Sequence, residues 1–173
     1  MKPWQRRFYF DQGGTLTLRP IRPEDEARHL DFFHKLDPED VRMRMFSARR
    51  SLEHTELARL TQIDYEREMA FLATIQVDGA EKEIGVCRYA VNPDGETCEF
   101  AIVVAEDWQH RGLARKLMGV LIETARSRGI QYMNGVFLAN NERMLKFVQK
   151  LGFVLSNDPE DSSVKLGVLA LQD

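Results

Sequence analysis

Runs of apolar residues with two different periods divide the chain into a helical first third and a strand-rich middle. Residues 15–19 alternate polar and apolar with the period of a strand, and a proline-led acidic segment at 22–25 then opens a helix. Two further short helices are expected to begin at 37–40 and 51–54, where cap-forming residues precede apolar positions. The first third is therefore predicted to be a strand followed by helices.

The middle of the chain is predicted to be an antiparallel meander. Three β-rich runs, at 69–77, 84–91 and 97–104, are separated by Asp78-Gly79 and by the turn at 92–95. Because both connections are short and built from turn-forming residues, consecutive runs should pair with each other in opposite directions.

The rest of the chain alternates helices with strands. An amphipathic helix over 113–125 should end at Gly129, and a second one, capped by Asn140-Asn141, should stop at Gly152. Strands are expected at 131–138, 153–156 and 164–171. The order β-α-α-(α)-β-β-β-α-β-α-β-β indicates an α/β fold whose mixed sheet is covered by helices on both faces.

Composition limits the class of protein. With 173 residues, of which 43% are hydrophobic and 29% charged, the chain can bury one hydrophobic core and is neither disordered nor fibrous. Twenty-four basic and 27 acidic residues give a net charge of −3, so a surface-wide attraction for nucleic acid is not expected. We expect residues 1–14 to be an N-terminal extension and residues 15–173 to form a single domain.

Cysteine, histidine and hydropathy patterns argue against metal and membrane partners. Cys87 and Cys98 have neither metal-ligand nor disulfide-framework spacing and should be buried, reduced thiols, and the four histidines share no metal-binding spacing. The longest apolar run, at 100–105, is far shorter than the roughly 18 residues of a membrane span. We therefore expect a cytoplasmic protein without a metal, membrane or nucleic-acid partner.

The segment from Trp108 to Lys116 has the features of an anion site. Gly112 removes a side chain where a backbone can approach a ligand, and the first N–H groups of the following helix lack intrahelical acceptors. The basic side chains before the first acid, Glu123, are Arg111, Arg115 and Lys116. Together with the helix dipole they favour a pyrophosphate, although a solvated basic helix face is the alternative. The glycine spacing is not that of a nucleoside triphosphate or dinucleotide loop.

Two motifs carry a resemblance to a known family. Gln109-x-x-Gly112-x-Ala114, after the strand that ends at Val104, resembles the Gln/Arg-x-x-Gly-x-Gly/Ala signature of the GCN5-related N-acetyltransferases (GNAT). The stretch from Asn141 to Phe153 is similar to the Asn-x-x-(small)-…-Lys-x-Gly-Phe segment of that family. The resemblance implies the GNAT (acyl-CoA N-acyltransferase) fold, with a mixed, mostly antiparallel sheet.

Within this superfamily, two further segments resemble the acetyltransferase domain of the bacterial protein lysine acetyltransferases. These segments are Leu18–Glu26 and Asp64–Ala70. Members of that group acylate a lysine on enzymes such as acyl-CoA synthetases, which implies a protein partner of that kind. Tyr65 and Glu68, in the second segment, are candidates for substrate contact or for ordinary surface positions of a turn.

The resemblance also implies acetyl-CoA as co-substrate. In the family, loop amides hold the coenzyme A pyrophosphate, while the pantetheine arm pairs like a strand with the end of the preceding strand. The cofactor-binding residues implied for this chain are Ile102, Val103, Val104, Gln109, His110, Arg111, Gly112, Leu113, Ala114, Arg115, Asn141 and Met144.

Glu99 is the candidate catalytic residue. A lysine amine is mostly protonated at neutral pH, so acetyl transfer benefits from a base. Glu99 lies on the strand that enters the loop and shares a strand face with Ala101 and Val103, and the resembling enzymes place their catalytic glutamate on the same strand. A solvated or cross-strand-paired carboxylate is the alternative. Val148 stands where many relatives carry a tyrosine acid, so no general acid is assigned.

Three functions remain open at this point. The leading hypothesis is an acetyl-CoA-dependent N-acetyltransferase that acts on a protein lysine by direct attack in a ternary complex. A transferase for a small amine would keep the fold and change the acceptor groove, where sequence is least informative. A non-catalytic acyl-CoA-binding module is supported by the absence of tyrosine at 148 and opposed by the presence of Glu99.

Overall fold

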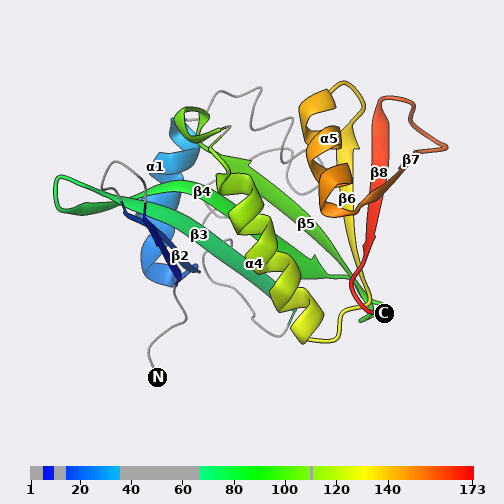
Figure 1. Cartoon of the computed structure of the whole chain (residues 1–173), viewed down its shortest axis with the longest axis horizontal. Helices are drawn as coiled ribbons and strands as arrows, with labels where there is room; N and C mark the ends of the chain where they lie inside the picture. The colour runs from blue at the N-terminus through cyan, green and yellow to red at the C-terminus, as the bar shows by residue number, and fades with distance from the viewer. Residues whose placement is uncertain (1–5, 10–14, 36–66, 110) are drawn as a thin grey trace.

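A mixed sheet of eight strands, with helices on both faces, makes up the described part of the chain (Figure 1). The computed structural model describes residues 6–9, 15–35, 67–109 and 111–173. The helices expected to begin at 37–40 and 51–54 lie outside these residues. The α/β fold class predicted from the sequence is confirmed.

The described elements follow one another much as the hydrophobic pattern predicts. The strands are β1 (Arg6–Tyr9), β2 (Thr15–Pro20), β3 (Glu68–Val77), β4 (Ala80–Val91), β5 (Thr97–Val104), β6 (Tyr132–Leu138), β7 (Val154–Asn157) and β8 (Val164–Ala170). The helices are η1 (Pro23–Asp25), α1 (Glu26–His34), η2 (Glu106–Trp108), α4 (Leu113–Ser127) and α5 (Glu142–Leu151). The spatial strand order is β1-β2-β3-β4-β5-β6-β8-β7.

Two strand assignments differ from the sequence prediction. β4 begins at Ala80 rather than at 84, because Asp78 and Gly79 both have positive φ angles and form a two-residue turn that pairs Val77 directly with Ala80. β1 was not predicted at all, and it pairs antiparallel with β2 from within the expected N-terminal extension. Both stretches contain polar residues, so they lack the apolar alternation by which a strand is predicted.

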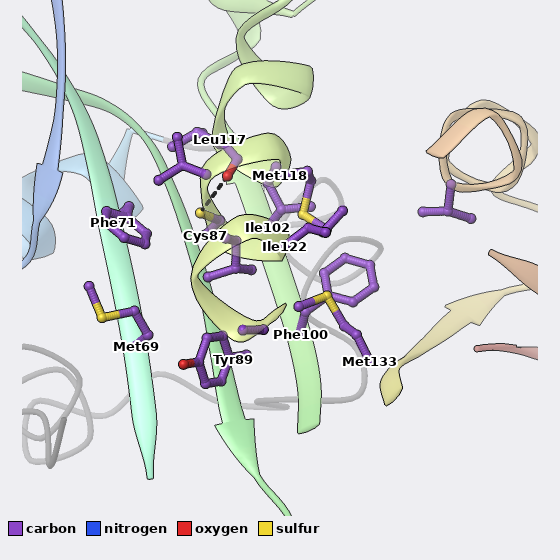
Figure 2. Packing of buried hydrophobic residues seen from close by; sticks show 14 of the residues in the cluster. Met69, Phe71, Cys87, Tyr89, Phe100, Ile102, Leu117, Met118, Ile122 and Met133 are labelled. Carbon is purple, nitrogen blue, oxygen red and sulfur yellow. Dashed lines mark hydrogen bonds between the residues drawn. The ribbon is translucent and has the colours of Figure 1, made fainter. Parts of the chain in front are cut away.

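The two faces of the sheet have separate cores. α4 and α5 cover one face, where Leu117, Leu121 and Val148 belong to the larger cluster of buried residues. Figure 2 shows part of this cluster under α4, with the Cys87 thiol donating to the Leu117 carbonyl at 3.4 Å. α1 covers the other face through Phe32 and Phe33, in a smaller cluster over β3, β4 and β5.

A buried ionic network fixes the start of α1. The Arg19 guanidinium donates to both oxygens of Asp25, at 2.8 and 2.6 Å, and to both oxygens of Glu81, at 3.0 and 2.8 Å. Burial would raise the pKa of the Asp25 carboxyl, but hydrogen bonds from Arg19 and from the Arg22 N–H outweigh it and lower that pKa. The segment 18–26, which carries part of the family resemblance, therefore joins β2, α1 and β4.

The feature that shapes the functional site is a divergence in the middle of the sheet. β5 and β6 run parallel and pair only over Thr97–Tyr132, Cys98–Met133 and Glu99–Asn134, whereas every other pairing of described strands is antiparallel. Beyond these three pairs the two strands separate (Figure 1). We call the space between residues 100–104 and 135–138 the seam.

An aromatic cluster lies beside the seam on the α4–α5 face. The Phe100 ring is 5.9 Å from that of Phe137 and 5.2 Å from that of Phe153, measured between centroids. Gly135 and Gly167 face each other across β6 and β8, and a Cβ on Gly135 would lie 2.5 Å from Phe137 and 2.6 Å from Phe100. The two glycines therefore make room for the aromatic rings beside the seam.

Candidate active site

A cavity of about 350 Å³ opens at the seam, between the N-terminus of α4 and the side of α5. This volume is within the range of small-molecule sites. Its wall combines strand, loop and two helices. The lining residues are Ile102, Val104, Trp108, Gln109, Gly112, Leu113, Ala114, Arg115, Asn141, Arg143, Met144, Phe147, Lys150 and Leu151.

The free edge of β5 supplies backbone groups to this cavity. The Ala105 N–H donates to the Ile84 carbonyl at 2.9 Å, so the odd-numbered residues of β5 direct their backbone groups to β4. The even-numbered residues face the other way, as shown by the Glu96 carbonyl, which accepts from the Tyr132 N–H at 3.3 Å. The backbone groups of Ile102 and Val104 are therefore directed into the seam.

The loop after β5 is tied to the strand by the first residue of the signature motif. The Gln109 side-chain amide donates to the Val104 carbonyl at 3.2 Å, and Gln109 itself lines the cavity. The Arg111 guanidinium lies 4.9 Å from the Trp108 ring centroid, where it makes a cation–π contact. These contacts hold the loop against the mouth of the cavity.

The N-terminus of α4 presents donors and positive charge to the cavity. Gly112 has φ +81°, and a Cβ there would meet nothing nearer than the Lys116 Nζ at 3.9 Å, so the left-handed backbone explains the glycine better than crowding does. The first intrahelical bond runs from the Lys116 N–H to the Gly112 carbonyl. The N–H groups of residues 113–115 therefore lack helical acceptors, and the first turn carries no acid.

The opposite wall of the cavity is α5. The Asn141 side chain caps this helix by accepting from the Met144 N–H at 3.3 Å, and both residues line the cavity. Arg143 and Phe147 also line the cavity, and neither was among the residues predicted from the sequence. Helical spacing could have identified them as lining residues, because residues 143, 147 and 150 recur on one face of α5.

Most of the predicted cofactor-binding residues come together in this cavity. Nine of the twelve line it: Ile102, Val104, Gln109, Gly112, Leu113, Ala114, Arg115, Asn141 and Met144. Val103 does not, because its side chain belongs to the α1 cluster and its backbone groups pair with β4. Arg111 lies against Trp108 at the loop surface, and His110 is outside the described residues.

Glu99 lies at the closed end of the seam. It is the last residue of β5 that pairs with β6, opposite Asn134, and its side chain is half-buried. Nothing in the described part of the chain donates a hydrogen bond to its carboxylate, so the cross-strand-paired alternative is not observed there. Val148 is fully buried in the core, and no tyrosine is among the described residues that line the cavity.

Comparison with known proteins assigns the family. A family model described as the acetyltransferase (GNAT) domain matches residues 15–154. The chain belongs to this family. This GNAT domain is 37% identical over 161 residues to acetyltransferase PA5475 of Pseudomonas aeruginosa, a match that covers 93% of the chain and 87% of the relative.

Two further comparisons concern proteins named Pat. The chain is 31% identical over 143 residues to acetyltransferase Pat of Mycolicibacterium smegmatis, which covers 82% of the chain but 42% of that longer relative. The crystal structure of the GNAT domain of S. lividans PAT superposes with a TM-score of 0.82 over 96% of the chain and 97% of that domain, at 23% identity, and shows the shared fold. The family resemblance stated from the sequence is confirmed, and the chain is an N-acetyltransferase.

GNAT domains use acetyl-CoA, and the cavity suits such a ligand. Its phosphates require donors and cations, which this GNAT domain offers at the start of α4 and on α5 through Arg115, Arg143 and Lys150. Its pantetheine arm carries amide groups, which match the backbone groups that Ile102 and Val104 direct into the seam. Strand edge, loop and helices thus fit the ligand that the family uses.

Several other groups of this GNAT domain are unsuited to chemistry at the seam. Cys87 and Cys98 are buried free thiols, as predicted, and burial raises the pKa of both, that of Cys98 to about 12. Among the described residues, no group of His, Cys, Asp or Glu side chains could hold a metal ion. No helix in the described part of the chain is long and apolar enough to span a membrane.

Proposed function

We propose that this N-acetyltransferase transfers the acetyl group of acetyl-CoA to a lysine of a protein, with Glu99 as the base. The observation that carries the proposal is the position of Glu99, half-buried at the closed end of a seam whose open end leads to the cavity. A carboxylate there can meet an amine that enters from the sheet face opposite the cavity. The reaction then needs no covalent enzyme intermediate.

The residues have distinct tasks in this proposal. Acetyl-CoA supplies a thioester carbonyl, which an amine can attack once the amine has lost a proton. Ile102 and Val104 pair with the pantetheine arm through their backbone groups, and the N–H groups of residues 113–115 bind the pyrophosphate. Glu99 accepts the proton of the attacking ammonium. Because a thiol has a pKa of about 8.5, coenzyme A can leave as a thiolate without a tyrosine acid.

The choice of a protein acceptor has its own support. Residues 18–26 and 64–70 resemble the protein lysine acetyltransferases, and the similarity to acetyltransferase Pat extends over most of the chain. An acyl-CoA synthetase is the acceptor that this resemblance favours. We place the activity in the cytoplasm, where the two buried free thiols stay reduced. A small amine is the competing acceptor.

Label transfer tests the proposal. The purified protein is incubated with acetyl-labelled acetyl-CoA and either a cell lysate or a panel of small amines. Label on discrete protein bands, located on lysine by mass spectrometry, is the expected result. Label on small amines alone would favour the competing acceptor, and coenzyme binding without transfer would leave only a binding module.

Initial rates test the order of events. Direct attack requires both substrates on the enzyme at once, so double-reciprocal plots at several acetyl-CoA concentrations should intersect. Parallel lines would indicate a covalent acetyl-enzyme and would overturn direct attack.

A further inference from the structure

A continuous row of residues crosses the sheet face opposite α4 and α5, and it starts at Glu99. The strand registers place Glu99 beside Asn134, Asn134 beside Val168, and Val168 beside Val154. Tyr132 lies on the same face, two residues before Asn134 on β6. We call Glu99, Asn134, Val168, Val154 and Tyr132 the exposed strip.

The outer part of this strip is apolar and unusually open to solvent. Tyr132 is 46% exposed, Val168 41% and Val154 72%. In the described part of the chain only one other large apolar side chain is comparably exposed, Val77 at 41%, on the distant β3–β4 hairpin. α1 does not cover the strip, because its buried contacts are with β3, β4 and β5.

The inner part of the row suits a cation. On the other side of Glu99 the register continues to Ala90 and then to Glu68. Ala90 is exposed and small, so two half-buried glutamates flank an open position on the sheet. Arg88 lies in the next row, paired with Ala101. An ammonium group placed over Ala90 would lie beside the Glu99 carboxylate.

The dimensions of the row distinguish a protein from a small amine. From Glu99 to Val154 there are three strand spacings, or roughly 14 Å at about 4.8 Å each. A small amine is held by the groups next to its nitrogen, and gains nothing from exposed valines at that distance. A lysine on a protein surface brings neighbouring apolar residues with it.

We propose that the exposed strip is the docking surface for the acceptor protein. The lysine enters beside Glu99, and apolar residues of the acceptor next to that lysine pack on Tyr132, Val168 and Val154. This inference rests on the proposed function and specifies which surface of the enzyme contacts the acceptor protein. Burial of three exposed apolar side chains supplies the affinity, and Glu99 selects a cation.

Aspartate substitutions on the strip test the proposal. Val154→Asp and Val168→Asp each place an unpaired charge in the proposed interface, while Val77→Asp makes the same change at an exposed valine elsewhere. The reactions use lysate proteins as one acceptor and free N-α-acetyllysine as the other. Both strip variants should label the lysate proteins at least about tenfold more slowly, a loss equal to about 1.4 kcal/mol.

The two acceptors keep folding and docking apart. Transfer to N-α-acetyllysine and the KM for acetyl-CoA should be unchanged in both strip variants, which also shows that they are folded, and Val77→Asp should match the wild-type protein throughout. Wild-type rates on lysate proteins for Val154→Asp and Val168→Asp would overturn the docking surface. So would a change from dimer to monomer in gel filtration with loss of transfer to both acceptors, because the strip would then join two copies of the chain. A wild-type protein that labels no lysate protein would instead overturn the proposed function.

Discussion

Glu99 combines two properties that few residues of the sheet share. Its backbone belongs to the last pair that holds β5 and β6 together, so its position is fixed, whereas its carboxylate lies on the open face without a described hydrogen-bond donor. A base needs both a fixed position and an available lone pair. The sequence predicted the strand and the face on which Glu99 lies, but not the divergence of β5 from β6, which depends on residues some 35 positions away.

Replacement of Glu99 by glutamine tests its role as a base. The amide keeps the size of the side chain but cannot accept the proton, so kcat should fall by roughly 10²-fold or more while the affinity for acetyl-CoA is retained. Steady-state kinetics and calorimetric titration with acetyl-CoA give the two quantities. Glu96→Gln, at an exposed position just before β5, is the matched control. An unaltered kcat in Glu99→Gln would exclude this residue as the base.

A second carboxyl group, far from the cavity, is held in an unusual state. Glu83 on β4 and His29 on α1 are fully buried, with Oε2 and Nδ1 2.7 Å apart. Burial, followed by the positive charge of Arg88, lowers the pKa of His29 to about 3. Burial and the negative charge of Asp25 raise the pKa of Glu83 well above 4.5. Both shifts favour the uncharged forms of the two side chains, and in these forms the Glu83 carboxyl donates to an unprotonated Nδ1 of His29.

The pKa shifts of Glu83 and His29 determine how the contribution of this pair to the stability of the fold depends on pH. Because its pKa is raised, Glu83 contributes fully to stability below pH 4.5, and this contribution is lost as the pH rises. Because its pKa is lowered, His29 contributes fully above pH 6.5, and this contribution is lost as the pH falls. The two slopes cancel between pH 4.5 and 6.5, so the pair contributes most there and less on either side.

Glu83→Gln should remove the loss on the alkaline side. Relative to the wild-type protein, the free energy of unfolding of the variant should rise by up to about 1.4 kcal/mol per pH unit as the pH increases above 4.5, where Glu83 begins to lose its contribution. Urea unfolding at a series of pH values measures it, and the contributions of other groups cancel in the difference. A difference that stays constant with pH would show that the pair carries no extra proton.

At the scale of elements, α4 has a left-handed glycine at each end, and the two glycines have different tasks. Gly112 has φ +81° and starts the helix at the cavity, while Gly129 has φ +79° and ends it, with no atom near a substituted Cβ. The sequence predicted Gly129 as the end of the helix, whereas it predicted Gly112 as a point of close backbone approach to a ligand and not as a left-handed residue. It predicted an anion site only for the first, because only there do basic residues and free helix N–H groups coincide.

Replacing each glycine by alanine distinguishes an effect on the stability of the fold from an effect on acetyl-CoA binding. Gly112→Ala and Gly129→Ala should each lower the free energy of unfolding by about 1 kcal/mol, since both force a side chain into the left-handed region. Only Gly112→Ala displaces the N–H groups proposed to bind the pyrophosphate, so only it should raise the KM for acetyl-CoA, by roughly tenfold. Equal KM values in the two variants would contradict the proposed anion site.

The helices and strands also differ in how well their positions could be predicted from sequence patterns. The meander, α4 and α5 follow from alternation, helical period and capping residues, and they were predicted within a few positions. The start of β4 and the whole of β1 were not, because polar residues such as Glu81 and Lys82 pair in the sheet without an apolar alternation to mark them. Glu81 is held there by Arg19, a contact between residues 62 positions apart.

At the scale of the whole molecule, the sheet is two antiparallel parts joined at three residue pairs. The glycines that face each other on β6 and β8 leave space for the rings of Phe100 and Phe137, which pack against each other on the α4–α5 face. No local pattern could predict this packing, because it needs the positions of three strands at once. The cavity lies on the side of β5 where its pairing with β6 has ended.

Gly135→Ala should disturb this arrangement. Its Cβ would lie 2.5 Å from Phe137, so the free energy of unfolding should fall by about 1–3 kcal/mol. Adding Phe137→Leu should recover part of that loss, giving a coupling between the two sites in a double-mutant cycle. Thermal or urea unfolding measures both effects.

Gly119→Ala is the control for that variant. Gly119 is exposed within α4 and has open space at its Cβ position, so alanine there should stabilise the protein by about 0.5–1 kcal/mol. A Gly135→Ala variant as stable as the wild-type protein would show that the rings move aside easily and do not set the width of the seam.

Because only a narrow junction joins the two parts of the sheet, the concentration of acetyl-CoA should also affect how much of the enzyme stays folded. A ligand held by β5 and α4 on one side and by α5 on the other bridges both parts, and it binds only when they are assembled. Such a ligand raises the free energy of unfolding by about 2.7 kcal/mol when its concentration is about 100 times Kd. Cells rich in acetyl-CoA would then keep more of this protein folded and out of reach of proteases, so abundance as well as turnover would follow metabolic state.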